Sequence, residues 1–195
     1  MPRHFLCFCL LLAFSRAAFP ARCNDTAYCQ PANEDTWAGW GASYANTRFN
    51  NTDNNPINSS TLQRLQLKWA YGFDNARSVI GNPALHGNRI FIGDENGQVY
   101  SLDRDSGCED WVFQADNGVR TMPLIENING RWLVIFGDRS ANVFAVDALT
   151  GQQVWKVEVE EHPAAILTGA PQYLVLENEP SPHRIIIPVS SGEEG

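Results

Sequence analysis

Two copies of one turn pattern constrain the fold of this chain more than any other feature of its sequence. Within each copy, an Asp is followed by a Gly four residues later and by a Trp eight residues later. An Asp side chain can accept backbone N–H bonds across a tight turn, and a Gly can take the positive φ that ends it. The copies are LDRDSGCEDW, with Asp103, Gly107 and Trp111, and VDALTGQQVW, with Asp147, Gly151 and Trp155.

A third tryptophan extends the pattern into a repeat. Trp69, Trp111 and Trp155 follow one another at intervals of 42 and 44 residues, and each lies in a run with the composition of a strand. This period is typical of one four-stranded propeller blade. A flat indole at the same place in each blade can fill the gap between neighbouring twisted sheets. We therefore interpret the pattern as a structural joint between repeats.

Short strands joined by tight turns account for most of the remaining sequence. The connections ENG and RSAN have hairpin length, so the order strand, hairpin, strand, Asp turn, strand occurs twice. The segment SSTLQRLQLKW predicts a short helical turn that enters a strand at Leu67. We predict an all-β propeller of four-stranded blades. The predicted strands are NRIFIGD, GQVYSLD, DWVFQAD, RWLVIFGD, NVFAVD, QVWKVEV and HRIIIPVS.

The N-terminus has the pattern of a secretory signal. Arg3 precedes an apolar run from Phe5 to Phe14 and small residues follow, so residues 1–18 are predicted to be a cleaved signal peptide. The run is shorter than the roughly 20 residues that span a bilayer. We expect an exported protein, periplasmic or secreted, with no membrane span. Residues 19–58 are expected to be irregular, with first contacts to the propeller edge, and residues 59–195 to form the blades.

Charge and cysteines narrow the range of partners. The net charge is -8 and no basic stripe is present, which excludes nucleic acid as a partner. In an oxidising compartment, a bridge from Cys23 to Cys29 would close a short loop and leave Cys108 unpaired. No Cys-x-x-Cys-His segment for covalent haem is present.

The order of several longer motifs resembles a known family. The succession WAGWGASYANTRFN, LQLKWAYGFDNARS, GVRTMPLI, TGAPQYLVL and VSSGEEG, with the two docking motifs between them, is similar to that of the pyrroloquinoline quinone (PQQ) dehydrogenases, and to polyvinyl alcohol dehydrogenase in particular. The resemblance covers nearly all of the chain after the signal. It implies an eight-bladed propeller, of which about three blades are present.

The resemblance also implies a cofactor site. Arg120 matches the arginine that pairs with the carboxylate and quinone oxygens of PQQ, and its always-charged planar fork suits that task. Thr168 and Ser191 match hydroxyl residues that hydrogen-bond the quinone. Glu194, with Glu193 as the alternative, matches a ligand of the calcium ion that polarises the quinone carbonyl. From the residues alone, the two glutamates are as readily read as solvated charges.

Two departures from the family pattern stand out. Ile80 occupies the position before Gly81 where alcohol-oxidising relatives often place a cofactor-binding Glu. The Asn that completes the calcium site and the Asp that acts as general base are expected beyond Gly195, so the chain contains no catalytic residue of its own.

Three functions remain open on the sequence. The resemblance implies part of an exported alcohol dehydrogenase that transfers hydride to PQQ and passes electrons to a cytochrome c, and that is inactive alone. The alternatives are a non-catalytic propeller scaffold of the outer-membrane assembly type and a truncated remnant.

Overall fold

The structure is a computed structural model that describes residues 36–37, 48, 57–176 and 182–191. The predicted signal peptide, Cys23, Cys29, Glu193 and Glu194 lie outside these residues. The described chain is built from antiparallel strands, with one turn of 3-10 helix, η1 (Leu62–Arg64). The prediction of an all-β fold is therefore confirmed. No helix among the described residues is long and apolar enough to cross a membrane.

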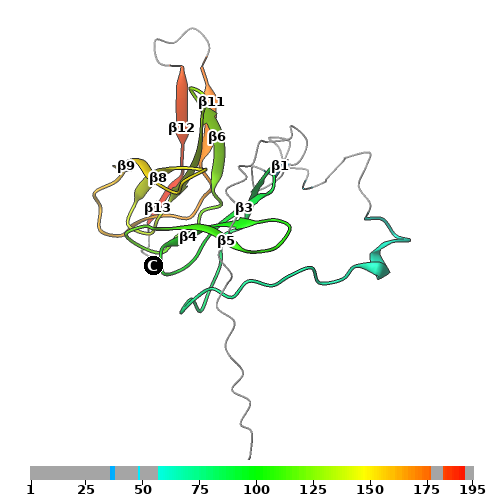
Figure 1. The fold of residues 1–195 in the computed structure, drawn as a ribbon. Helices are drawn as coiled ribbons and strands as arrows, with labels where there is room; N and C mark the ends of the chain where they lie inside the picture. The colour runs from blue at the N-terminus through cyan, green and yellow to red at the C-terminus, as the bar shows by residue number, and fades with distance from the viewer. Residues whose placement is uncertain (1–35, 38–47, 49–56, 177–181, 192–195) are drawn as a thin grey trace, which may run out of the picture.

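Two sheets form two successive blades (Figure 1). Five strands pair in chain order in the first sheet and four in the second. In both sheets a register shift interrupts the pairing of the last two strands at equivalent places, after Ser101 and after Ala145. The first sheet is β1 (Thr36–Trp37), β2 (Ala84–His86), β3 (Arg89–Gly93), β4 (Gln98–Asp103) and β5 (Glu109–Gln114), and the second is β6 (Leu124–Ile128), β7 (Arg131–Gly137), β8 (Asn142–Asp147) and β9 (Gln153–Glu158).

A third blade begins after the second. Its first two strands are β11 (Gln172–Val175) and β12 (His183–Ile186), and a short ladder joins β10 (Ala165–Leu167) to β13 (Val189–Ser191). The inner strands of successive blades touch, since β2 contacts β6 and β6 contacts β11. Figure 1 shows β6, β11 and β12 standing side by side. The inner strands of successive blades thus lie next to one another, as they do around the axis of a propeller.

Buried aspartates shape the hairpin turns of both blades. Asp94 is fully buried, and its Oδ1 accepts the backbone N–H groups of Asn96 and Gln98 at 2.9 Å each. Asp138 does the same in the second blade for the residues that follow it, at 2.9 and 3.0 Å. Such bonds satisfy turn N–H groups that the ladder leaves free.

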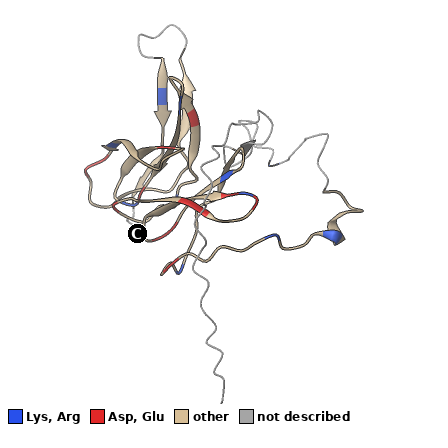
Figure 2. Cartoon of the chain, in the orientation of Figure 1, with Lys and Arg blue, Asp and Glu red and all other residues tan. Residues whose placement is uncertain are grey.

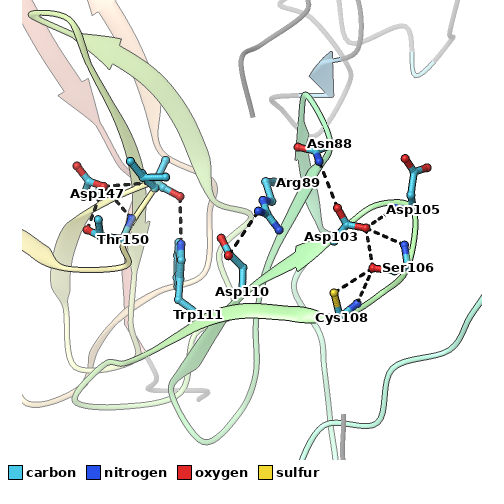
Figure 3. Close-up of polar contacts among 12 residues, drawn as sticks. Asn88, Arg89, Asp103, Asp105, Ser106, Cys108, Asp110, Trp111, Asp147 and Thr150 are labelled. Carbon is cyan, nitrogen blue, oxygen red and sulfur yellow. Dashed lines mark hydrogen bonds and ion pairs between the residues drawn. The ribbon is translucent and has the colours of Figure 1, made fainter. Parts of the chain in front are cut away.

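The Asp turns of the two sequence repeats have the same geometry (Figure 3). Asp147 Oδ1 accepts the N–H of Leu149 at 3.0 Å and the N–H and hydroxyl of Thr150 at 2.8 and 3.0 Å. Asp103 accepts the equivalent bonds from the N–H groups of Asp105 and Ser106 and from the Ser106 hydroxyl. Burial opposes ionisation of Asp147, but bonds from Arg131 and Thr150 hold its pKa below the usual value. The turn carboxylate is therefore ionised at neutral pH.

Two of the three repeat tryptophans, Trp69 and Trp111, dock on the turn of the following repeat. Trp69 Nε1 donates to the carbonyl of Arg104 at 2.9 Å, and Trp111 Nε1 donates to the carbonyl of Ala148 at 3.1 Å. A Cβ added to Gly107 would lie 2.5 Å from the Trp69 ring, and one added to Gly151 would lie 2.7 Å from the Trp111 ring. The motif position therefore requires glycine for two reasons: its φ is positive, and the indole lies where a Cβ would be.

An apolar core fills the space between the two blades. Phe113 packs edge-on against Phe136 and Phe144, which stack on each other with ring centroids 5.5 Å apart. These rings belong to a cluster that includes Phe91, Trp111 and residues of β6 to β8. The cluster spans both sheets, so the blades share one core.

Three expectations need correction. No strand is present at Leu67, because no described segment offers the residues around it a ladder partner; Leu67 is 84% exposed. HRIIIPVS is split into β12 and β13, since Pro188 has no N–H to donate to a ladder. Thr36–Trp37, in the segment expected to be irregular with first contacts to the propeller edge, pairs with β2, which is a contact of the kind expected there. Cys108, expected to be unpaired, is disulfide-bonded. It is only partly buried at its surface turn, which makes its sulfur reachable for a second cysteine.

Replacement of Trp111 tests the joint between the blades. We expect Trp111→Ala to lower the free energy of unfolding by about 3 to 5 kcal/mol, because it removes a buried aromatic ring and its hydrogen bond to the next repeat. The measurement is the urea unfolding midpoint of the purified chain. Val112→Ala is the matched control, since Val112 is the next residue on β5 but is 37% exposed. Equal shifts for the two variants would contradict a docking role for the indole.

We expect a lower pH to reduce the free energy of unfolding through His86, which lies between the two blades. This side chain is 6% exposed, its ring lies 4.1 Å from that of Trp132, and its Nε2 has no partner among the described residues. Burial lowers the pKa of His86 below the usual histidine value of 6.5. The unfolded chain therefore binds the proton more readily, so stability is full above pH 6.5 and falls as the pH drops through that value.

Thermal unfolding between pH 8 and pH 5.5 measures this dependence. We expect His86→Phe, which keeps a ring against Trp132, to flatten the slope in the range where His86 titrates. His162→Phe serves as the control because His162 is exposed. An unchanged slope in His86→Phe would show that His86 does not carry the acid sensitivity.

Candidate cofactor site at the turn end of the inner strands

Backbone hydrogen bonds place Arg120 at a repeated position in the fold. The segment before each inner strand is bonded to the hairpin turn of its own blade: Glu95 N–H donates to the Ser78 carbonyl at 3.3 Å, and Arg139 N–H donates to the Gly118 carbonyl at 3.0 Å. Ser78 and Gly118 are therefore equivalent. It follows that Ile80 and Arg120, each two residues further on, are equivalent as well.

A second set of bonds extends the equivalence to Thr168. Val119 N–H donates to the carbonyl of Asp94 at 2.8 Å, and Leu167 N–H donates to the carbonyl of Asp138 at 3.2 Å. Asp94 and Asp138 are the matching turn residues of the two blades. Arg120 and Thr168, which follow Val119 and Leu167, thus hold the same place in successive repeats.

Side-chain packing supports the same alignment. A Cβ on Gly93 would lie 2.4 Å from Val119 Cγ1, and one on Gly137 would lie 2.6 Å from Leu167 Cδ1. Val119 and Leu167 are fully buried against these glycines. The residue that follows each of them is consequently held at a fixed position at the turn end of the inner strands.

Arg120 is anchored by its neighbours but has no partner for its own Nε. Thr121 is fully buried, and its Oγ1 donates to the Gly137 carbonyl at 3.1 Å and accepts the Gly137 N–H at 3.0 Å. This bridge fixes the backbone beside Arg120. The Nε atom of Arg120 is buried and makes no hydrogen bond to any described residue. A buried guanidinium N–H of this kind is costly unless an acceptor binds to it, and an anionic acceptor binds it best.

The other predicted site residues are placed less uniformly. Thr168 is exposed and follows Leu167, which pairs with Val189. Ser191 is also exposed but pairs with Ala165, so the two hydroxyl residues lie toward opposite ends of the β10–β13 ladder. The structure therefore brings Arg120 and Thr168 to matching positions and does not set Ser191 beside Thr168.

Metal binding finds no support within the described part of the chain. No group of three or more His, Cys, Asp or Glu side chains there could hold a metal ion. The candidate calcium ligands, Glu194 and Glu193, lie outside that part, so their role stays a prediction.

The sequence motifs did not reveal that Ile80, Arg120 and Thr168 hold equivalent positions. The three equivalent segments read Val79-Ile80-Gly81, Val119-Arg120-Thr121 and Leu167-Thr168-Gly169. Each is an apolar residue, a variable residue and a small one. That shared pattern was the available signal, but the intervals of 40 and 48 residues differ from the tryptophan spacing and conceal it.

A cavity at the outer edge of the first blade contains none of the predicted cofactor residues. It has a volume of about 470 Å³. Tyr71 and Tyr100 line it and donate to Glu109 and Asp94, at 2.9 and 3.0 Å. Burial, followed by these carboxylates, raises the pKa of both phenols well above the usual value. Neither tyrosine can serve as a base at neutral pH.

Charges elsewhere are dispersed. Figure 2 shows both Lys and Arg and Asp and Glu spread over separate strands and turns of the described chain. The pair Arg89 and Asp110, with Nη2 3.4 Å from Oδ1, is the most buried ion pair that we describe.

Comparison with known proteins gives consistent results. Residues 48–192 match the PQQ_2 family, described as outer membrane protein assembly factor BamB. The chain is 30% identical over 164 residues to a polyvinylalcohol dehydrogenase from Pseudomonas sp, covering 82% of this chain and 24% of that protein. It is 27% identical over 158 residues to the quinohemoprotein alcohol dehydrogenase of Comamonas testosteroni, covering 76% of this chain and 22% of that protein.

Solved structures show the same fold. The crystal structure of the quinohemoprotein alcohol dehydrogenase from Comamonas testosteroni superposes with a TM-score of 0.65 at 22% identity, over 85% of this chain and 24% of that one. A europium-containing methanol dehydrogenase superposes with a TM-score of 0.62 at 24% identity, over 82% of this chain and 28% of that one. The chain spans about a quarter of the length of these relatives. With blades stacked through docked tryptophans and a family match over most of its length, the chain belongs to the PQQ-type propeller family, and its relatives there are quinoprotein alcohol dehydrogenases.

Proposed function

We propose that this chain is the N-terminal part of an exported PQQ-dependent alcohol dehydrogenase. Polyvinyl alcohol is a candidate substrate, because two relatives at 30% and 31% identity are polyvinylalcohol dehydrogenases. The observation that carries the proposal is the buried Nε of Arg120, which lacks a hydrogen-bond acceptor at the turn end of the inner strands. PQQ is a planar anion whose carboxylate and quinone oxygens can supply that acceptor.

The residues of this chain would bind and orient the cofactor. Arg120 would pair with the carboxylate and quinone oxygens, and the Thr121 bridge would keep its backbone from moving. Thr168 and Ser191 would hydrogen-bond the quinone, and Glu194, or Glu193, would bind calcium. When bound, PQQ accepts the hydride from the alcohol carbon, and calcium polarises the quinone.

The remaining chemistry belongs to parts of the protein that this chain does not include. The chain spans about a quarter of its relatives, so we assign the general base, the rest of the calcium site and the contact with an electron acceptor of the cytochrome c type to the remainder. On this proposal, residues 1–195 alone are inactive. Export to the periplasm or the medium follows from the predicted signal at residues 1–18 and agrees with the disulfide at Cys108.

A non-catalytic scaffold is the second candidate. The matching family is described as an outer membrane protein assembly factor, and the docking joints would serve a scaffold equally well. In a scaffold, however, the buried Arg120 Nε, which has no acceptor among the described residues, would only destabilise the fold, because no ligand would bind there to supply the acceptor. The two candidates therefore differ in whether PQQ binds.

Direct titration with PQQ tests the proposal. In the full-length protein that contains this chain, with calcium present, we expect saturable quenching of tryptophan fluorescence. Arg120→Ala should weaken binding by roughly 10- to 100-fold, since a hydrogen bond to a charged group contributes about 1.5 to 3 kcal/mol. Arg139→Ala is the matched control because it removes an exposed positive charge from the adjacent hairpin turn.

The outcomes separate the candidates. Weaker binding in Arg120→Ala, with Arg139→Ala unchanged, supports a cofactor site at Arg120. Absence of saturable binding in the unaltered protein would exclude the dehydrogenase and leave the scaffold.

A further inference from the structure

The cavity at the outer edge of the first blade has the size of a ligand site. Its volume of about 470 Å³ lies within the range of roughly 300 to 1,000 Å³ that small-molecule sites occupy. Residues of β4 and β5 line it, together with Tyr71 and Asp74 from the segment that precedes β2. Since none of the candidate cofactor residues is among them, a ligand in this cavity would be separate from PQQ.

Aromatic rings give the cavity a rigid apolar surface. Tyr71 and Tyr100 line it, and their ring centroids lie 5.6 Å apart in an edge-on contact. Phe73 packs edge-on against both rings, at 5.0 Å from Tyr71 and 5.1 Å from Tyr100. Because these contacts hold the rings in place, C–H groups of a ligand can pack on them without first ordering the side chains.

The phenol protons of the cavity are already used within the protein. Tyr71 Oη donates to Glu109 Oε2 at 2.9 Å. Tyr100 Oη shares its proton between Asp94 Oδ2 at 3.0 Å and Gln98 Oε1 at 2.7 Å. Because the Gln98 oxygen accepts from Tyr100, the Gln98 amide nitrogen is the end that can donate to a ligand. The polar lining thus combines one amide donor with several acceptors.

Most of the negative charge around the cavity is compensated. Asp110 Oδ1 lies 3.4 Å from Arg89 Nη2, and Asp94 accepts two backbone N–H groups of its turn. Asp74 is exposed at the cavity, where a ligand can reach its carboxylate directly. Water screens an exposed carboxylate, so a cation gains little there, and an anion is repelled. A neutral hydroxyl group fits this lining, because it can donate to Asp74 and accept from Gln98.

The cavity lies away from the proposed cofactor site. It is lined by the outer strands β4 and β5, whereas Arg120 precedes the inner strand β6 and its carbonyl lies beside Gly81, ahead of β2. A small alcohol can occupy only one of these places at a time. A long chain with repeated hydroxyl groups can contact both, so the cavity suits a polymer.

We propose that this cavity is a second binding site for a neutral, polyhydroxylated chain, which holds one part of a polymeric substrate while another part reaches the cofactor. Asp74 accepts a hydrogen bond from one hydroxyl of the chain, Gln98 donates to another, and the C–H groups between them pack on Tyr71. This inference rests on the proposed function, because it takes a hydroxyl-bearing polymer as the substrate.

Calorimetric titration with polyvinyl alcohol tests the site without turnover. In the full-length protein before PQQ is added, we expect saturable binding. Asp74→Ala should raise the dissociation constant by roughly 3- to 10-fold through the loss of one hydrogen bond. Asp74→Asn should raise it less, because its amide oxygen still accepts. Glu161→Ala is the matched control, since it removes an exposed carboxylate from outside the cavity.

Steady-state kinetics of the protein loaded with PQQ and calcium give a second readout. Asp74→Ala should raise the KM for polyvinyl alcohol by a similar factor and leave kcat unchanged, because the cavity holds the chain but does not touch the reacting carbon. The PQQ dissociation constant of the variant should equal that of the unaltered protein. The melting temperature of each variant identifies any loss that comes from unfolding.

The results distinguish this inference from the proposed function. If the protein binds PQQ but Asp74→Ala binds the polymer normally, the cavity is not the polymer site and the proposed function stands. Equal losses in Asp74→Asn and Asp74→Ala, or displacement of the polymer by tetramethylammonium, would show that the cavity selects positive charge and would overturn a neutral ligand. If the protein binds no PQQ, the proposed function fails, and the titration with polyvinyl alcohol still decides whether the cavity binds the chain.

Discussion

The architecture depends on the contact between an indole and a glycine of the following repeat. Trp111 lies on Gly151 and donates to the carbonyl of Ala148, and Trp69 makes the same contact with Gly107 and Arg104. The ring supplies buried area, the N–H satisfies a carbonyl of the turn, and the absent Cβ makes the approach possible. Since the turn belongs to one blade and the ring to another, neither blade completes its own motif. Folding of each blade is thus coupled to that of its neighbour.

Glycines also make close packing possible at the turn end of the inner strands. Gly93 and Gly137 allow Val119 and Leu167 to enter the sheet of the preceding blade. These buried contacts hold the residue one position later, and that residue is where the proposed site begins. The scaffold and the site are therefore linked by these van der Waals contacts, by the backbone hydrogen bonds of Val119 and Leu167 to the turn aspartates, and by the bridge of Thr121 to Gly137.

Sequence patterns predicted the strands that alternate strongly and lie between clear turn residues. β3, β4, β5, β7, β8 and β9 were all expected from their composition, and the Asp turns form the bonds expected of them. Inner strands such as β2 and β6 were harder, because β2 is only three residues long and β6 contains Glu126 and Asn127. The strand at Leu67 failed for a different reason: β propensity alone forms no ladder when no partner strand lies beside it. The partner of each docked tryptophan was not predicted either, since it depends on how repeats stack.

The three residues at the head of the inner strands differ in a way that has a wider consequence. Backbone bonds relate each of them to its neighbour in the set, and an apolar residue precedes and a small residue follows each one, yet the residues themselves are an isoleucine, an arginine and a threonine. In this fold the flanking apolar and small residues are constrained by packing, whereas the residue between them can differ in chemistry from one blade to the next. A ring assembled from such units can acquire a new ligand one side chain at a time, without any cost to the joints that hold it together.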